Sequence, residues 1–252
     1  YLGLELLSLS LYAMVALQRD SARATEAAMK YFVLGALASG VLLYGMSMVY
    51  GATGSLQFDA IYAASGTTPS PMLFKLGVVF VVAGVAFKFG AAPFHMWLPD
   101  VYQGAPTAVT AYIASAPKMA AFAMAYRLLE SAAGNSMADW VPLIAILSAL
   151  SLVLGNLMAL VQSSFKRLLA YSTISHVGFL FLGLLSADAS GYAAAMFYAI
   201  SYAITAVAAF GSLILLSHAG YDADDIDGFR GLWVRHPGYA FLILFVTTSR
   251  QS

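Results

Sequence analysis

Three charged residues, Glu5, Lys88 and Lys118, stand inside long apolar runs of this 252-residue sequence. A charge at the centre of a lipid bilayer costs at least about 2.5 to 3.5 kcal/mol, so each of them needs a compensating role. Lys118 is the thirteenth residue of the run that starts at Pro106, which places it about 18 Å into a helix. Glu5 is the only acid within an apolar run and is the natural counter-ion for one lysine. These three residues are candidate carriers of translocated protons.

Lys88 lies in an apolar run, residues 72–98, that is too long for one straight membrane span. Pro93 and Pro99 are expected to break it, because proline lacks the backbone N–H and clashes with the preceding turn. A broken helix inside a membrane is tolerated only where protein or a water-filled cavity satisfies the freed backbone groups. We therefore predict a discontinuous element that lines a polar path over residues 87–106, with Lys88, His95, Trp97, Asp100 and Gln103.

His176 sits at the midpoint of the apolar run 168–185, with Ser172 and Ser175 on its helical face. An imidazole titrates near neutral pH, so His176 is a candidate proton relay. For a single histidine or acid, a hydrogen bond between helices that only fixes packing explains the residue equally well. Two deeply placed lysines, one acid and a broken helix together favour ion transport over that structural role.

The elements that must position these residues are membrane-spanning helices. Hydrophobic residues make up 61% of the chain and charged residues only 10%, whereas an ordinary soluble domain has about 25% charged residues. The apolar runs approach the roughly 20 residues that a helix needs to cross a bilayer. A single transmembrane domain over residues 1–252, truncated at both ends, is therefore expected. Its predicted spans are 31–50, 72–98, 106–126, 140–161, 168–185 and 191–216, with a partial span at 1–17 and the start of another at 237–248.

If these runs cross the membrane in turn, the connections alternate between its two sides. One side then carries Arg127, with Lys75 just inside a helix. Lys and Arg are enriched in cytoplasmic loops, which makes the opposite, cation-rich side the cytoplasmic one. The residues on that side are Arg19, Arg23, Lys30, Lys166, Arg167, Arg230 and Arg235.

Charge and cysteine content exclude several classes of function. The net charge is zero and no basic cluster is present, so nucleic acid is not an expected partner. Without cysteine, the chain cannot form disulfides or thiolate-ligated iron–sulfur and zinc sites. An acidic loop lacks the spacing of a calcium-binding EF-hand and is predicted to be a solvated connection. Its acids are Asp222, Asp224, Asp225 and Asp227.

The stretch FKFGAAPFHMWLPDVYQGAPTAVTAYIASAPK, residues 87–118, closely resembles the antiporter-like membrane subunits of proton-pumping NADH:quinone oxidoreductase, respiratory complex I. YLGLELLSLSLYAMVAL at the start of the chain and FKRLLAYSTISHVGF at 165–179 agree with it. Among the three paralogous branches, VYQGAP at 101–106 and the lysine at 118 favour the subunit N branch.

This resemblance implies an antiporter-like helix bundle with inverted repeats and a discontinuous helix near Lys88 to Pro106, of which the chain supplies the fifth helix into the twelfth. Glu5 matches the acid of the fifth helix, Lys88 the lysine of the discontinuous seventh, and Lys118 the lysine of the eighth. Lys166 and His176 match polar residues of the tenth and, with His95, are expected to be secondary proton relays. The family's twelfth helix carries a further lysine, whereas this chain ends VTTSRQS at 246–252.

The implied function is proton translocation in a bacterial inner membrane, coupled to redox chemistry in partner subunits. Flavin, iron–sulfur clusters and quinone are expected in those partners, and no cofactor or metal is expected in this chain. The expected partners are the other membrane subunits of complex I, including the paralogous antiporter-like ones, and the lipid bilayer.

Three alternatives stay open. The first is an Mrp-type sodium/proton antiporter subunit, and the second is a purely structural membrane subunit. The third is a haem-binding electron carrier with His95, His176 and His218 as axial ligands, which is disfavoured because each histidine lies on a different run.

Overall fold

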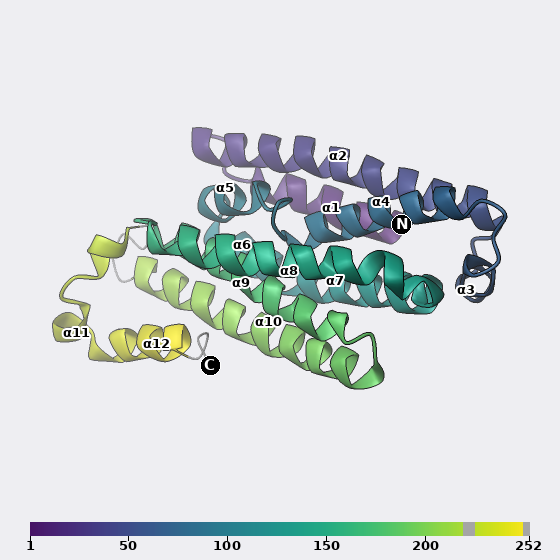
Figure 1. The fold of residues 1–252 in the computed structure, drawn as a ribbon. Coiled ribbons are helices and arrows are strands. Elements are labelled where there is room, and N and C mark those ends of the chain that lie inside the picture. Colours follow the sequence, from purple (N-terminus) through teal and green to yellow (C-terminus); the bar gives the residue numbers. More distant parts are fainter. Residues whose placement is uncertain (219–224, 249–252) are drawn as a thin grey trace.

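The computed structural model describes residues 1–218 and 225–248, and this part of the chain contains helices and no β-strand. The helices form one bundle, with α2 along one edge and α10 with α12 along the opposite edge (Figure 1). The elements are α1 (Leu2–Val15), α2 (Ala22–Thr53), α3 (Phe58–Ser65), α4 (Pro71–Phe89), α5 (Trp97–Gly104), α6 (Thr107–Ala114), α7 (Ala116–Tyr126), the π-helix η1 (Arg127–Ala132), the 3-10 helix η2 (Gly134–Ser136), α8 (Met137–Leu160), α9 (Phe165–Leu185), α10 (Ala189–His218), the 3-10 helix η3 (Ile226–Phe229), α11 (Leu232–Arg235) and α12 (Pro237–Thr248).

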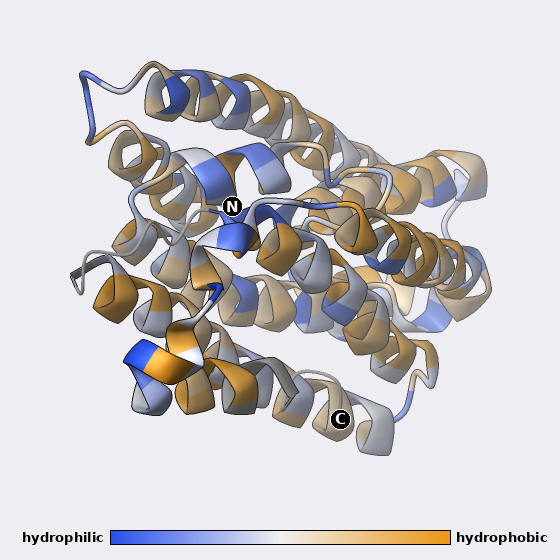
Figure 2. Cartoon of the chain, turned by 90° about the vertical axis from the view of Figure 1, so that its left-hand side faces the viewer, coloured by the Kyte–Doolittle hydropathy of each residue, from blue (hydrophilic) through white to orange (hydrophobic). Residues whose placement is uncertain are grey.

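Among the described residues, α2, α4, α8, α9 and α10 are long and apolar enough to cross a membrane, and α1 is a shorter apolar helix. Hydrophobic residues recur along these helices (Figure 2), and large apolar side chains such as Leu37 and Phe197 are exposed on their outer faces. A helix that is hydrophobic on all sides is typical of a membrane span. The predicted all-α, polytopic architecture is confirmed.

The long run 72–98 is interrupted, as predicted. Helix α4 ends at Phe89, and its C-cap residue Gly90 has φ +74°. A Cβ at position 90 would lie 2.3 Å from Leu98 Cδ1, so glycine alone fits this turn. Pro93 lies in the break, but Pro99 lies in the first turn of α5, where proline is tolerated because its N–H would have no helical partner. The prediction that Pro99 also breaks the helix was wrong.

The run 106–126 does not form one continuous helix. It is divided at Ser115 into α6 and α7, and Pro117 stands in the first turn of α7. The Ser115 hydroxyl donates to the carbonyls of Ala111 (2.8 Å) and Tyr112 (3.1 Å) at the end of α6. Proline at 117 cannot donate to the preceding turn, so the run predicted as one span is interrupted there.

Aromatic packing around Trp97 holds the break in the α4–α5 segment inside the bundle. Trp97 stacks on Tyr31 of α2, with ring centroids 4.5 Å apart and an interplanar angle of 11°. Its Nε1 donates to the carbonyl of Phe87 near the end of α4 (3.1 Å). Ala91 and Ala92, within the break, are fully buried. The interrupted backbone is therefore enclosed by protein, as irregular backbone at membrane depth requires.

Candidate functional site

Glu5 and Lys88 form a partly buried ion pair that two serines complete. The Lys88 ammonium lies 3.6 Å from Glu5 Oε1 and donates to the hydroxyls of Ser8 (2.8 Å) and Ser39 (3.2 Å). The Ser39 hydroxyl donates in turn to Glu5 Oε1 (2.7 Å). Helices α1, α2 and α4 each contribute to this group. The expected pairing of Glu5 with a lysine is present, and its part in proton transfer stays a prediction.

Lys118 is buried in α7 and binds the end of the helix that carries Lys88. Its ammonium donates to the carbonyl of Phe89, the last residue of α4. The last carbonyls of a helix lack helical partners and carry partial negative charge, so a cation is stabilised there. No carboxylate of the described residues forms an ion pair with Lys118. Lys118 therefore bonds the residue that directly follows Lys88 in the last turn of α4.

A small cavity of about 20 Å³ lies beside Lys88. Ser8, Tyr12 and Trp97 line it, together with Pro117, the neighbour of Lys118. A cavity of about 10 to 15 Å³ accommodates one water molecule when polar groups surround it. The space is therefore large enough for one water between the Glu5–Lys88 pair and the helix that carries Lys118.

His176 belongs to a separate polar group between α9 and α10. Its Nδ1 lies 2.6 Å from the Tyr198 hydroxyl, and its ring centroid lies 5.0 Å from that of Tyr202. The Tyr202 hydroxyl lies 2.6 Å from Thr173 Oγ1, one turn before His176 on α9. His176 is thus part of a row of hydroxyl and imidazole groups that can exchange hydrogen bonds along these two helices.

The two other predicted relay residues lie apart from the Glu5–Lys88 pair. Lys166 is buried in the first turn of α9 and lines a polar cleft of about 390 Å³, together with Arg23 and Gln103. His95 lies half-buried in the break between α4 and α5, and its Nδ1 has no hydrogen-bond partner among the described residues. The structure brings neither of them into the Glu5–Lys88 group.

Asp100, predicted to line the polar path, instead clamps three helices together. One carboxylate oxygen accepts from Arg167 of α9 (2.7 Å) and the other from Lys30 of α2 (2.8 Å). Arg167 also donates to Gln103 (3.3 Å), which tightens the hold on α5. Burial raises the pKa of Asp100, but the hydrogen bonds from Lys30 and Arg167 outweigh it, so that the pKa lies below its ordinary value of 3.8. The carboxylate stays charged and bound at neutral pH.

Part of the acidic loop lies outside the described residues, namely Asp222 and Asp224. Asp225 accepts from the backbone N–H of Asp227 (3.1 Å), and Asp227 pairs with exposed Arg230 (2.9 Å). In the part of the chain that the structure describes, no group of three or more His, Cys, Asp or Glu side chains could hold a metal ion. Of the unusual tail 246–252, residues 249–252 also lie outside the description.

Residues 1–251 match the model of the family described as "NADH:quinone oxidoreductase/Mrp antiporter, TM". The chain belongs to this family. The resemblance inferred from the segment 87–118 is thereby confirmed, as is the discontinuous helix that it implied.

Within the NADH:quinone oxidoreductase/Mrp antiporter family, the chain is similar to curated proteins named NADH-quinone oxidoreductase subunit N. The identity is 59% to the protein of Xanthomonas euvesicatoria, over 99% of this chain and 51% of that protein. It is 58% to the protein of Thiobacillus denitrificans, over 99% of this chain and 52% of that protein. The chain therefore spans about half the length of the curated relatives it matches, and the preference for the subunit N branch is confirmed.

Solved structures of the family share the fold. A chain of respiratory complex I from Thermus thermophilus is 39% identical, with a TM-score of 0.81 over 99% of this chain and 53% of that chain. A chain of the Mrp complex from Dietzia sp. has a TM-score of 0.84 over 98% of this chain and 46% of that chain. Its 23% identity supports similarity of fold alone.

Several residues of the site were not found from the sequence. Ser39 bridges the ion pair, but an isolated serine in an apolar run carries no distinctive signal. Tyr198 and Tyr202 were also missed, although their spacing of four residues places both hydroxyls on one face of a predicted helix. That spacing is a usable signal for a polar stripe along α10.

Proposed function

We propose that this chain translocates protons as part of a membrane subunit of an NADH:quinone oxidoreductase, with Glu5, Lys88 and Lys118 as the central carriers. The observation that carries the proposal is the partly buried Glu5–Lys88 pair, bridged by Ser39, at the same helix break that Lys118 binds. Curated relatives of this chain are named NADH-quinone oxidoreductase subunit N, which supports the same function.

The mechanism follows from how surroundings change the charge of a lysine. Burial disfavours the charged ammonium, whereas a neighbouring carboxylate favours it. With Glu5 close, Lys88 holds a proton; separation of the pair makes it release that proton toward Lys118. A water in the small cavity beside Lys88 provides a path between them. Redox chemistry in partner subunits, which hold the flavin, iron–sulfur clusters and quinone, drives the separation.

Beyond Lys118, His176 and the hydroxyls around it carry the proton onward, with Lys166 and His95 as secondary relays. Moving one charge through 100 mV costs about 2.3 kcal/mol. A change of about two units in the pKa of a carrier, at 1.36 kcal/mol each, supplies a comparable free energy. Forming and breaking one partly buried ion pair is therefore sufficient in scale to move a proton against a membrane potential.

The protein works in a bacterial inner membrane beside other membrane subunits of complex I, including the paralogous antiporter-like ones. The end of the bundle with Arg19, Lys166 and Arg230 faces the cytoplasm. Lys and Arg enrichment at that end supports this orientation.

The test is proton pumping by the intact complex in sealed inverted vesicles, with Glu5→Gln or Lys88→Ala in the full-length subunit. Both variants are expected to lower pumping at least tenfold while the complex still assembles. Lys75→Gln is the matched control, because Lys75 pairs with Asp139 (2.9 Å) away from the break. Unchanged pumping by an assembled Lys88→Ala complex would remove Lys88 from the path.

A sodium/proton antiporter is the second candidate, because the family model that matches residues 1–251 includes Mrp antiporters. The two candidates differ in what drives transport. Sodium-dependent proton release in vesicles without NADH or quinone would favour the antiporter. Pumping that depends on NADH oxidation and persists without sodium would favour the oxidoreductase subunit.

A further inference from the structure

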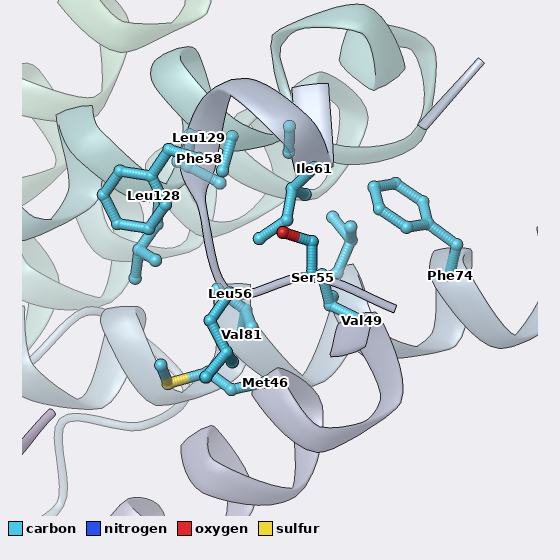
Figure 3. A pocket seen from close by; sticks show the side chains of 13 residues that line it. Met46, Val49, Ser55, Leu56, Phe58, Ile61, Phe74, Val81, Leu128 and Leu129 are labelled. Carbon is cyan, nitrogen blue, oxygen red and sulfur yellow. The ribbon is translucent and has the colours of Figure 1, made fainter. Parts of the chain in front are cut away.

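An apolar pocket of about 70 Å³ lies at the end of the bundle opposite Lys166, outside the proposed proton path. Its walls come from α2, α4, α3 and η1. Figure 3 shows Phe58, Leu128 and Leu129 gathered on one side of the space and Phe74 on the other. Ser55 is the only lining residue with a polar side chain. The pocket therefore offers almost nothing that could orient a water-soluble molecule.

The pocket extends from the surface of the membrane into its hydrocarbon region. Leu56, in the connection between α2 and α3, stands at its exposed end and is 76% exposed. Val81 lies ten residues after the start of α4 at Pro71, which places the inner end about 15 Å along that helix. A segment of a narrow apolar chain that enters from the bilayer fits such a space.

A cation stands at the outer end of the pocket. The Arg127 guanidinium lies over the ring of Phe58, 5.2 Å from its centroid, and this contact holds it in place. Arg127 is exposed, and no carboxylate of the described residues forms an ion pair with it. Lys75, the other cation near this end, is bound to Asp139 (2.9 Å). Arg127 therefore keeps donors for an external anion, and guanidinium donors match the geometry of a phosphate.

The local backbone places this cation and the pocket wall together. Arg127 begins the π-helix η1, and Leu128, Leu129 and Ala132 of the same element line the pocket. π-helical turns are rare and often occur at functional sites. One wide turn thus presents a cation and three apolar side chains of the pocket wall, which are the kinds of group that a phospholipid phosphate and acyl chain contact.

We propose that this pocket binds a segment of one acyl chain of an anionic phospholipid of the surrounding bilayer, with the lipid phosphate on Arg127. An anionic headgroup is preferred to a zwitterionic one because no carboxylate of the described residues neutralises the Arg127 guanidinium in an ion pair. The site requires no element of the proton path, so the two proposals can fail independently.

The test extracts the full-length subunit in its native membrane and measures the retained lipids by native mass spectrometry. Wild type is expected to retain about one phosphatidylglycerol or cardiolipin per copy at this site. Arg127→Gln is expected to lower the ratio of anionic to zwitterionic lipid about fivefold, equivalent to about 1 kcal/mol for one arginine at a lipid surface. Arg19→Gln, at an exposed position at the other end, is the matched control.

Two further variants test the acyl chain. Ala132→Phe fills the pocket, and Leu56→Glu places a carboxylate at its exposed end without changing a buried position; both are expected to release the lipid. Ala123→Phe, on the exposed face of α7, is the control for added volume. The same retained lipid in wild type and Leu56→Glu overturns the proposal. So does a photocrosslinker at position 56 that labels a polypeptide instead of a lipid, because a protein segment would then occupy the pocket.

Discussion

At the scale of single residues, hydroxyl groups hold the Glu5–Lys88 pair at a separation that can change. The charged atoms are 3.6 Å apart, longer than a direct charge-assisted hydrogen bond of about 2.7 to 2.9 Å. Ser39 fills the gap by accepting from Lys88 and donating to Glu5. If this ion pair opens, each charged group can still keep a hydrogen bond to a hydroxyl group.

Ser39→Ala should therefore weaken pumping without removing either charge. The loss of a hydrogen bond to a charged group corresponds to about 1.5 kcal/mol, or roughly tenfold in rate. Ser39→Thr keeps a hydroxyl and should restore most of the activity. The control is Ser10→Ala, since the Ser10 hydroxyl bonds only the Leu6 carbonyl on the exposed face of α1. Equal pumping by the Ala and Thr variants would contradict a bridging role.

Lys118 should have two separable roles, because it both binds the end of α4 and is a candidate proton carrier. Lys118→Met leaves the Phe89 carbonyl buried without its donor, which should lower the free energy of unfolding by about 1 to 3 kcal/mol and abolish pumping. Lys118→Arg keeps a cationic donor but hardly deprotonates. It should therefore retain thermal stability and lose pumping. If Lys118→Arg pumps normally, Lys118 acts as a fixed charge and not as a proton carrier.

At the scale of elements, the sequence predicted which helices exist better than where they break. Long apolar runs are conspicuous, so α8, α9 and α10 were found with their approximate bounds, whereas α2 begins at Ala22, nine residues before its predicted start. The break in 72–98 was predicted from Pro93. Pro99 was wrongly expected to break the helix as well, because α4 already ends at Phe89, before Gly90, and Pro99 then falls in the first turn of the next helix. The interruption at Ser115 was underestimated, because a serine that bonds the preceding turn gives no signal in composition. Tertiary contacts decide both positions.

Gly35→Ala should separate α1 from α2 and so disturb the Glu5–Lys88 pair. A Cβ at position 35 would lie 1.9 Å from the hydroxyl of Tyr12, which shares the face of Glu5 and Ser8 on α1. Overpacking of this kind typically costs about 1 to 3 kcal/mol. Gly40→Ala in the same helix meets nothing within 4 Å and should be neutral or stabilising by about 0.5 to 1 kcal/mol. Melting temperatures of the two variants, measured side by side, check the difference.

The Asp100 clamp should make the packing of α2, α5 and α9 depend on acid pH. Because its folded-state pKa lies below 3.8, Asp100 contributes stability that is fully present above about pH 4 and is lost as pH falls through the folded pKa. Asp100→Asn should therefore be less stable at pH 7, by roughly 1 to 3 kcal/mol for two lost charge-assisted hydrogen bonds. The difference from wild type should shrink as the pH falls below 4.

The control for this clamp removes an ion pair on its outer side. Glu26→Gln deletes an exposed i,i+4 pair with Lys30 (2.7 Å), and exposed pairs of this kind contribute little to stability because solvent screens them. Thermal unfolding of Asp100→Asn and Glu26→Gln across the same pH range separates the two. If the melting temperature falls by the same amount in both variants, Asp100 acts only as a surface charge.

At the scale of the whole molecule, the two ends of the bundle are chemically different. Cations that were predicted to share a side do meet in the structure: Lys30 and Arg167 share Asp100, and Arg23 and Lys166 line one cleft. Two of the predicted spans are interrupted, but the prediction that these cations share one side still holds. The side of each connection depends only on the order of the membrane crossings, and a broken helix still counts as one crossing. The polar cleft is at this end and the apolar pocket at the other.

This asymmetry predicts the orientation of the protein in its membrane. The sequence contains no cysteine, so single cysteines can be introduced at exposed positions on either end and labelled with a membrane-impermeant maleimide. Asp20→Cys, between α1 and α2, should be labelled in inverted vesicles and protected in intact spheroplasts. Thr67→Cys, between α3 and α4, should show the opposite pattern, with the unsubstituted protein as the control for other thiols. The reverse result would place the Lys166 cleft outside the cytoplasm and require protons to load Lys88 from the other side.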